Sequence, residues 1–250
     1  MFMRFVHYRV QHELIDDFRR RYEEVSIPAL KTVPGCRSAT LIQGADADDE
    51  WISMTIWDSR DDAEAYEKSD VYKTLSQSSR LFLAQSSEWR VQLNKDLQLA
   101  LEPVPEEPVV RTYEVAAHTG EGAMPGGESM YVRIVAPQVR RECVDEFRRL
   151  YTREILPVVR NEPGCRYAYL VEGADERDQF LSVTIWENAR VAERYERSGD
   201  FQRLTEKVRH TFSGVYQWKM ELEQSTGSRV VTTEDMTVRG YWIVTGGGIV

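Results

Sequence analysis

Several features that identify common protein classes are scarce or absent in this 250-residue sequence. It has only three cysteines and no apolar run of the roughly 18 residues that a membrane span needs, so we expect neither a disulfide framework nor a transmembrane helix. The first residues, Met1–Val10, lack the apolar core and cleavage site of a secretory signal. These absences favour a cytoplasmic protein with reduced thiols.

Positive charge is also scarce. The 32 Lys and Arg side chains are outnumbered by 41 Asp and Glu, which gives a formal net charge of −9. Nucleic acids and anionic membranes attract basic patches, so we expect neither as a partner. The sequence has no GxGxxG or phosphate-binding loop, and no His/Cys cluster with the spacing of a metal site. We therefore expect no metal, no nucleotide and no other cofactor.

What the sequence does contain is a long internal repeat. Thr55–Leu75 reads TIWDSRDDAEAYEKSDVYKTL, and Thr184–Leu204 reads TIWENARVAERYERSGDFQRL. The second copy begins 129 residues after the first, and the same offset holds without a gap from residue 1 to about residue 95. The pattern predicts one repeat over residues 1–118, a Gly-rich linker over 119–129 and a second repeat over 130–250.

Each repeat shows the order strand, helix, strand, strand, helix, strand, which is typical of the ferredoxin-like α+β fold. Ser59 is expected to cap a helix, with Asp62 in the reciprocal position of a capping box. In the first repeat we expect strands at Met1–Val10, Arg37–Gln43, Trp51–Trp57 and Glu88–Leu93. We expect a helix over about Glu13–Lys31, a helix that starts after the Ser59 cap, and a second helical piece from Asp70 to about Gln85.

The end of each repeat carries one more strand pattern. Leu101–Pro108 is rich in Pro and Glu and is expected to be an extended connector, followed by a fifth strand at Val109–His118. Val230–Val238 is the matching segment of the second repeat, and Tyr241–Val244 could extend it, with a frayed GGGIV end.

Alternating residues show which face of each sheet is apolar. Along Met130–Val139, the side chains of Val132, Ile134 and Ala136 share one face. Because the helices cover only one side of such a sheet, two repeats can bury their bare faces against each other. The sequence therefore predicts a single-chain pseudo-dimeric α+β barrel, and further homo-oligomers stay open.

The PGC turns at Pro34–Cys36 and Pro163–Cys165, the strands ending in TIW and the helix YEKSDVYK resemble the antibiotic biosynthesis monooxygenase family. The resemblance covers both repeats and implies a dimeric α+β barrel fold. The sequence is locally most similar to the heme-degrading branch, in which a Trp precedes KSDVFK and a heme-ligating His. Tyr66 and Tyr195 stand in place of that Trp, and Ser76 and Thr205 in place of the His. A hydroxyl does not serve as an axial ligand in ordinary heme sites, so heme degradation is not expected.

The sequence also resembles the cofactor-free oxygenases that convert phenols to quinones. In that branch a flat substrate binds between sheet and helices, and the deprotonated substrate itself gives an electron to oxygen. The resemblance implies a biosynthetic cofactor-independent monooxygenase, with an aromatic or polyketide-like small molecule and O2 as partners. A cyclase or isomerase that uses the same pocket without oxygen, and a non-catalytic small-molecule-binding protein, stay open as alternatives.

Four side chains are candidate catalytic groups. Tyr66 and Tyr195 lie on a helix that faces the sheet, at the position where the resemblance places a pocket residue, and they are either core residues or hydrogen-bond donors to a phenolic substrate. His7 and His210 could act as bases, or could lie on the surface, because histidine titrates near neutrality. Neither His has a His partner in the other repeat, so we expect the two halves to have diverged and Tyr66 and Tyr195 to matter unequally.

The candidate substrate-binding residues also recur between the repeats, and each has a structural alternative. Trp57 and Trp186 either pack in the core or form a pocket wall, and the buried thiols Cys36 and Cys165 are expected to be inert. Arg4 and Arg133 lie on an otherwise apolar strand face, where we expect ion pairs between the repeats. The binding candidates are Trp57, Trp186, Arg80, Arg209, Arg133 and Tyr169.

Overall fold

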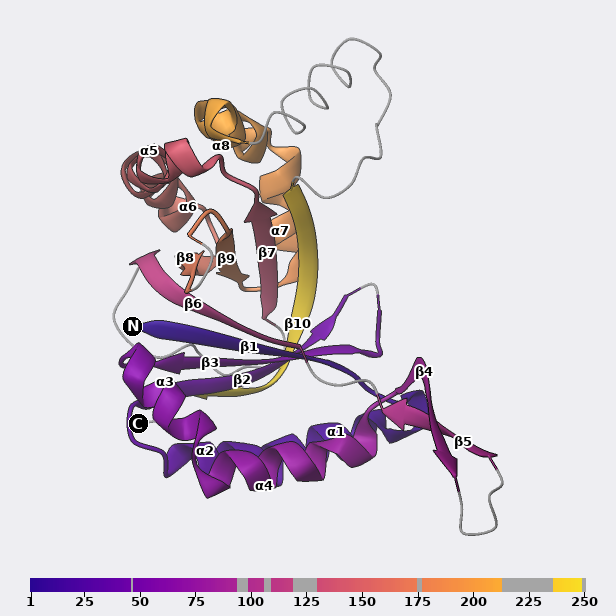
Figure 1. Cartoon of the computed structure of the whole chain (residues 1–250). Coiled ribbons are helices and arrows are strands. Elements are labelled where there is room, and N and C mark those ends of the chain that lie inside the picture. Colours follow the sequence, from indigo (N-terminus) through magenta and orange to yellow (C-terminus); the bar gives the residue numbers. More distant parts are fainter. Residues whose placement is uncertain are drawn as a thin grey trace.

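A ring of antiparallel strands lies at the centre of the molecule, with the helices of the first repeat on one side and those of the second on the other (Figure 1). The computed structural model describes the backbone of residues 1–45, 47–93, 99–105, 109–118, 130–174, 177–212 and 236–248. Side chains are described for residues 1–45, 47–84, 130–174 and 177–212. The expected linker, 119–129, lies outside the described residues.

The helices and strands follow the same order in both repeats, apart from β4 and β5, which are described in the first repeat alone. The first repeat contains β1 (Phe2–Arg9), α1 (Ile15–Arg21), α2 (Ile27–Lys31), β2 (Cys36–Gly44), β3 (Glu50–Trp57), α3 (Arg60–Glu67), α4 (Asp70–Ser79), β4 (Gln85–Leu93), β5 (Leu99–Pro105) and β6 (Val109–His118). The second contains β7 (Tyr131–Pro137), α5 (Val144–Leu150), α6 (Leu156–Asn161), β8 (Cys165–Gly173), β9 (Phe180–Trp186), α7 (Ala189–Arg197), α8 (Asp200–Val208) and β10 (Met236–Gly248).

The strand order confirms the predicted ferredoxin-like repeats and their pseudo-two-fold arrangement. Each repeat supplies a three-stranded sheet, β1-β3-β2 or β7-β9-β8, and the last strand of each repeat joins the two sheets. Strand β6 pairs with β1 of its own repeat and with β8 of the other, while β10 pairs with β7 and with β2. The ring of eight strands is closed by this exchange. Neither repeat completes its sheet alone.

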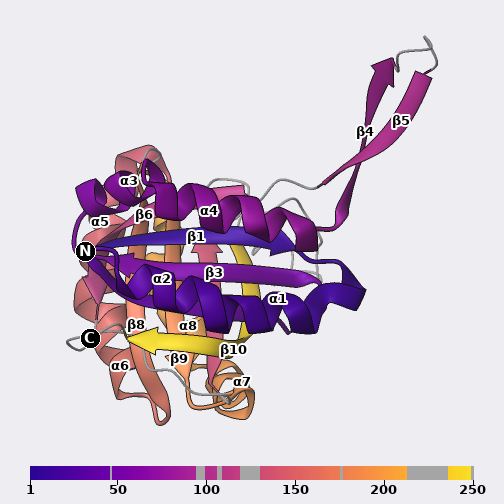
Figure 2. The same cartoon turned by 90° about the horizontal axis from the view of Figure 1, so that it is seen from below.

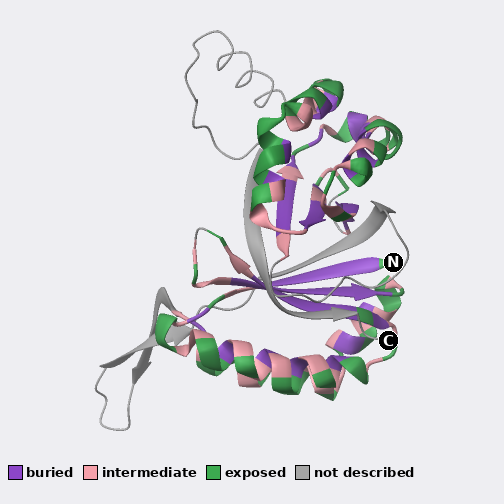
Figure 3. Ribbon diagram, turned by 180° about the vertical axis from the view of Figure 1, so that it is seen from behind, coloured by how far each residue is buried: buried purple, intermediate pink, exposed green. Residues whose placement is uncertain are grey.

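The interior of the ring is an apolar core made by both repeats. Met3 and Phe5 of β1 meet Val132 and Ile134 of β7 there, as the alternation along the strands predicts. Figure 3 shows the same division on the helices, whose inner sides are buried and whose outer faces are exposed. Among the described residues, none of the helices combines the length and the apolar character needed to cross a membrane.

The predicted fourth strand is placed differently in the structure. Residues Glu88–Leu93 belong to β4, which pairs with β5 in a separate hairpin that extends away from the ring (Figure 2). The strand beside β1 is β6, the expected fifth strand. The expected connector, Leu101–Pro108, is wrong for the part that β5 covers. Proline is tolerated there because in a two-stranded hairpin each strand is an edge strand, with one row of N–H groups outside the ladder.

The C-terminal strand also differs from the expectation. Strand β10 starts at Met236 and runs to Gly248, while 230–235 and 249–250 lie outside the described residues. Gly246, Gly247 and Gly248 pair with Thr40, Ala39 and Ser38 of β2, so these glycines are part of the sheet and not frayed. The pairing with β2 of the other repeat supplies partners that the local sequence does not reveal.

The first helix of each repeat contains a wider, π-helical turn. These turns span Tyr22–Ser26 and Tyr151–Ile155, and each precedes a proline at the start of the next helix. Proline has no N–H to donate and its ring clashes with the carbonyl oxygen four residues earlier, so the wider turn accommodates it. Such turns are frequent at functional sites, and here each begins at a tyrosine that lines a cavity.

Candidate functional site

Each repeat has a cavity between its helices and the outer face of its sheet. The cavity of the first repeat has a volume of about 180 Å³, and that of the second about 50 Å³. An apolar cavity of about 150 Å³ in another protein holds a benzene molecule. The first cavity therefore has room for an aromatic ring, and the second does not.

The first cavity is lined from three directions. Alternation along β1 turns Val6 and Tyr8 toward the helices, and the first helix contributes Phe18 and Tyr22. Helix α4 forms another side. The Ser69 hydroxyl oxygen fixes the start of this helix by accepting a hydrogen bond from the backbone N–H of Tyr72. The remaining lining residues are Ser26, Tyr72, Leu75, Ser76, Ser79 and Arg80.

Phenol hydroxyls give the first cavity its chemistry. The Tyr22 hydroxyl forms a 2.8 Å hydrogen bond with the Ser53 hydroxyl, and burial raises the pKa of Tyr22 far above its ordinary value. Burial also raises the pKa of Tyr8 to about 12, although the nearby Arg4 charge acts in the opposite direction. Both groups are therefore neutral hydrogen-bond donors at neutral pH.

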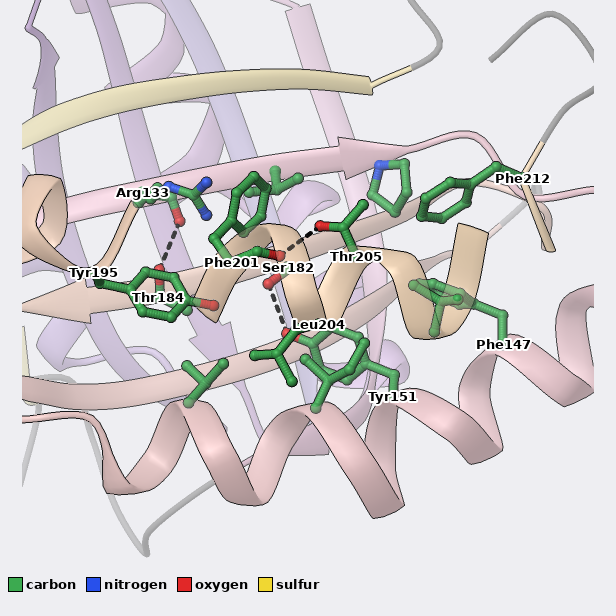
Figure 4. A pocket seen from close by; sticks show the side chains of 15 residues that line it. Arg133, Phe147, Tyr151, Ser182, Thr184, Tyr195, Phe201, Leu204, Thr205 and Phe212 are labelled. Atoms are coloured by element: carbon green, nitrogen blue, oxygen red, sulfur yellow. Dashed lines mark hydrogen bonds between the residues drawn. The ribbon is translucent and has the colours of Figure 1, made fainter. Parts of the chain in front are cut away.

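The second cavity keeps one of these contacts but is mostly apolar (Figure 4). The Tyr151 and Ser182 hydroxyls are 2.6 Å apart, and burial raises the pKa of Tyr151 to about 12. The Thr205 hydroxyl donates to the Phe201 carbonyl oxygen at 2.8 Å, so its proton is already used within the helix. Aliphatic and phenyl groups make most of the other walls: Val135, Phe147, Ile155, Phe201, Leu204 and Val208.

Arg4 and Arg133 are buried beside these cavities and pair within their own repeats. Arg4 Nε donates to Glu67 at 2.7 Å, and Arg133 Nε pairs with Glu196. The expectation of ion pairs between the repeats is therefore wrong. Both carboxylates come from the end of the helix that covers the same sheet, which brings them close without any contribution from the other half. In the described part of the chain, the Nη2 atom of each arginine has no hydrogen-bond partner.

A stacked Trp–Tyr pair anchors the helices to each sheet. The Trp57 and Tyr66 ring centroids are 5.0 Å apart, and those of Trp186 and Tyr195 are 5.1 Å apart. Both indole N–H groups donate to the threonine two residues earlier, at 2.9 and 2.8 Å. The tryptophans are fully buried, so they pack rather than form an open wall. Tyr195 lines the second cavity, whereas Tyr66 lies behind Tyr72, edge-on at 5.4 Å.

The PGC turn joins each first helix to its sheet. Gly35 adopts a φ of 77°, in the left-handed region that favours glycine, and a Cβ atom there would lie 2.5 Å from Asp62. Its carbonyl oxygen accepts a hydrogen bond from the Asp58 N–H at 2.8 Å, which holds the turn against the start of α3. The Ser59 cap of α3 is confirmed, although the Asp62 carboxylate bonds to the Ser59 hydroxyl rather than completing a capping box.

The turn also places a thiol in each repeat. All three cysteines are free, and burial raises the pKa of both Cys36 and Cys165 to about 12. A thiol with such a pKa carries almost no thiolate at neutral pH, so neither is suited to act as a nucleophile.

The two candidate histidines do not lie in these cavities. His7 shares the strand face of Met3 and Phe5, which points into the ring and away from the helices. His210 is exposed, and its Nε2 lies 3.1 Å from Glu146. Neither is among the lining residues, so the structure does not bring a histidine base to either site.

The remaining arginine and tyrosine candidates do not share one site: two of them line a cavity and two do not. Arg80 lines the first cavity at its exposed edge, whereas Arg209 does not line the second and lies 3.6 Å from Glu206. Arg133 lines the second cavity, with its guanidinium 4.2 Å from the Phe201 ring centroid. Tyr169 packs inside the ring, on the opposite face of the sheet from the cavity, because of its place in the alternation of β8.

Several lining residues were not among the sequence candidates. Tyr22 and Ser53 recur as Tyr151 and Ser182, so a repeated pair of polar groups was visible in the sequence. That pair gave no sign of a contact, because the two residues lie 31 positions apart on a helix and a strand. Tyr8 lacks even this signal, since it aligns with a proline in the second repeat.

Comparisons with known proteins agree with this architecture. The family model for antibiotic biosynthesis monooxygenase matches residues 1–77 and 130–207, which together make up more than half of the chain. A comparison with curated proteins gave no match.

Three solved structures share the fold over nearly the whole chain. A candidate monooxygenase from Fusobacterium nucleatum has a TM-score of 0.63 at 8% identity and covers 99% of this chain and 94% of its own. One from Lactobacillus acidophilus has a TM-score of 0.58 at 9% identity, covering 96% and 92%. An anthrone oxidase-like protein has a TM-score of 0.56 at 14% identity, covering 99% and 93%. At these identities the likeness concerns the fold alone.

Proposed function

Because the chain belongs to the antibiotic biosynthesis monooxygenase family, we propose that it is a cofactor-independent monooxygenase that acts on a small aromatic or polyketide-like molecule. The observation that carries this proposal is the helix–sheet cavity of the first repeat, which has room for a ring and is lined by the phenol groups of Tyr8, Tyr22 and Tyr72. An aromatic substrate also accords with the anthrone oxidase-like protein that shares the fold.

In this reaction a bound phenol is oxidised to a quinone. One oxygen atom of O2 enters the ring and the other leaves as water, and the substrate supplies all the electrons, so no redox cofactor is required. The protein has to favour the phenolate, hold it and exclude water. The neutral Tyr8 hydroxyl can donate a hydrogen bond to the phenolate oxygen, and the Arg80 guanidinium at the cavity edge lowers the energy of the negative charge.

Oxygen uptake tests the proposal. Purified protein is incubated with monocyclic and bicyclic phenols in an oxygen electrode, with a metal chelator present and quinone measured by absorbance. We expect one O2 consumed per quinone formed, without hydrogen peroxide. A product formed without oxygen uptake would indicate the cyclase or isomerase alternative. Tight binding without any turnover would indicate a binding protein.

The two stacked tyrosines provide a matched pair of variants. Tyr66→Phe should lower the rate of oxygen uptake several-fold, because the Tyr66 hydroxyl that it removes lies close enough to Tyr8 and Tyr72, which line the larger cavity, to interact electrostatically with both. Tyr195→Phe makes the same chemical change in the second repeat and should leave the rate within about twofold, less than the loss of one hydrogen bond would cause. Equal losses would contradict the expected inequality of the halves.

A further inference from the structure

The two cavities are built on the same aligned positions but differ in polarity. At four of these positions, a hydroxyl-bearing residue of the first repeat aligns with a residue that has no hydroxyl in the second. All four differences run in the same direction, although the second cavity keeps the hydroxyl groups of Tyr151, Ser182, Thr184, Tyr195 and Thr205. The aligned pairs are Tyr8 with Pro137, Ser26 with Ile155, Tyr72 with Phe201 and Ser79 with Val208.

Positive charge also differs between the cavities: Arg133 lines the second one, where Glu196 balances its charge, and the first has a different cation beside it. Arg21 Nη1 donates to the Ser26 hydroxyl at 3.1 Å, and Arg21 Nη2 donates to the Leu75 carbonyl oxygen at 3.2 Å, which holds the guanidinium against the wall of the first cavity. Burial lowers the pKa of Arg21, and the nearby Tyr8 acts against this shift. The residue that aligns with Arg21 is Leu150. A half-buried cation favours a negative group nearby, and the second repeat has no cation at this place.

The edge of the cavity shows a second difference in charge. Arg209 pairs with Glu206 and does not line the second cavity. The aligned Arg80 does line the first cavity, with its side chain at the exposed edge. Among the described residues that line the first cavity, none carries a carboxylate. The field in this cavity therefore favours an anion.

We propose that the first repeat holds a single ligand site per chain for a small hydroxylated aromatic anion, and that the second cavity is a structural core that does not bind it. The proposal deepens the proposed function, since the ligand would be the substrate of that reaction. Phe18 and Val6 can contact the faces of a ring, while the hydroxyls of Tyr8 and Tyr72 can bond to its oxygen atoms. The second cavity is too small for a ring, and its Tyr151 and Thr205 hydroxyls are already hydrogen-bonded to Ser182 and Phe201.

Anaerobic calorimetry with two probes tests the stoichiometry and the charge preference. The probes are 4-hydroxybenzoate and the neutral 4-methylphenol, which have the same ring and hydroxyl. We expect one 4-hydroxybenzoate per chain, and binding of 4-methylphenol at least tenfold weaker. Two equivalents of 4-hydroxybenzoate per chain, or no saturable binding of it, would overturn the proposal. Equal affinity for both probes would overturn the preference for an anion.

Exchanging residues between the repeats locates the site. Tyr72→Phe gives the first cavity the residue of the second and should weaken 4-hydroxybenzoate binding by about tenfold, the effect of one lost hydrogen bond in a buried site. The reciprocal Phe201→Tyr should leave the affinity unchanged. A loss caused by changes in the second repeat but not in the first would overturn the assignment. Thermal unfolding shows whether each variant is folded.

Binding measured without oxygen and turnover measured with oxygen test this proposal and the proposed function separately. One bound 4-hydroxybenzoate per chain, together with no oxygen uptake on any phenol, would refute the monooxygenase and keep the site. Oxygen uptake together with two bound molecules per chain would keep the monooxygenase and refute the division between the repeats.

Discussion

The first and second repeats agree closely where they build the ring and differ where they line the cavities. Both keep the buried tryptophan with its stacked tyrosine, the buried Arg–Glu pair and the PGC turn. The cavities, by contrast, differ in volume, about 180 against 50 Å³, and in four hydroxyl groups. The contacts that form the barrel and the groups that contact a ligand have thus been under different constraints within one chain.

The strand pairings between the repeats explain why the fold requires the second repeat. Strand β6 pairs with β8 and strand β10 pairs with β2, so each half completes the sheet of the other. The interior of the ring is likewise shared, with Ile52 and Met54 of one half packed in the same cluster as Val183 and Ile185 of the other. A repeat that bound no ligand of its own would therefore still be necessary as half of the barrel.

The largest effect that tests this comparison is expected at the two tryptophans. Trp57→Ala and Trp186→Ala should each lower the free energy of unfolding by about 3–5 kcal/mol, because each removes a fully buried indole and its stack. The two losses should agree within about 1 kcal/mol, since the packing is the same in both halves. Urea unfolding measures them, with Leu81→Ala, at a residue that is 75% exposed, as a control without effect. A much smaller loss in one repeat would break the structural equivalence.

The buried arginines give the next largest effect. Glu67→Gln and Glu196→Gln should each cost about 1–3 kcal/mol, because each leaves a buried guanidinium without its compensating charge. The exposed pair of Arg60 and Glu64 provides the control, and Glu64→Gln should cost no more than about 0.5 kcal/mol. If the loss at Glu67 matched that of the exposed control, Arg4 would be stabilised by its aromatic neighbours instead.

The repeat itself made most of the fold predictable. An ungapped match with helical and strand periodicities defines two similar units, and the alternation along Met130–Val139 correctly places Val132 and Ile134 on the face that lies inside the ring. The exchange of β6 and β10 was not predictable, because pairing between distant strands leaves no local pattern. For the same reason Glu88–Leu93, which has a strand pattern, was placed in the wrong sheet.

The candidate site was less predictable than the fold. Residue types and their repetition pointed to Tyr66 and Tyr195, but the cavity of the first repeat depends on Tyr8 and Tyr72, which have no tyrosine partners in the second repeat. Searching for features shared by the repeats therefore finds the scaffold and overlooks the groups that distinguish one cavity. Aligned positions that change from polar to apolar were the more informative signal.

A smaller effect, equal in the two halves, is expected at alkaline pH. Burial raises the pKa of Cys36 and of Cys165 from the ordinary thiol value of 9.0 to about 12. Above pH 9 the unfolded chain releases protons that the native chain retains, so stability is complete below pH 9 and is lost as the pH rises toward about 12. Cys36→Ala and Cys165→Ala should each make this decline less steep by the same amount, measured by urea unfolding from pH 8 to 11. A stability that increased with pH would contradict the assignment.

The smallest expected effect is none, and it concerns hemin. Ser76 lines the first cavity and Thr205 the second, so both positions that the heme-degrading branch fills with an axial histidine do face a cavity here. A neutral hydroxyl is a poor ligand for heme iron, and the Thr205 hydroxyl already donates to the Phe201 carbonyl oxygen. Titration with hemin should therefore give no shifted, saturable Soret band from either repeat. A band that saturated at one hemin per chain would reveal a ligand in one half alone, whereas saturation at two would show that the cavities are equivalent for this ligand despite their different walls.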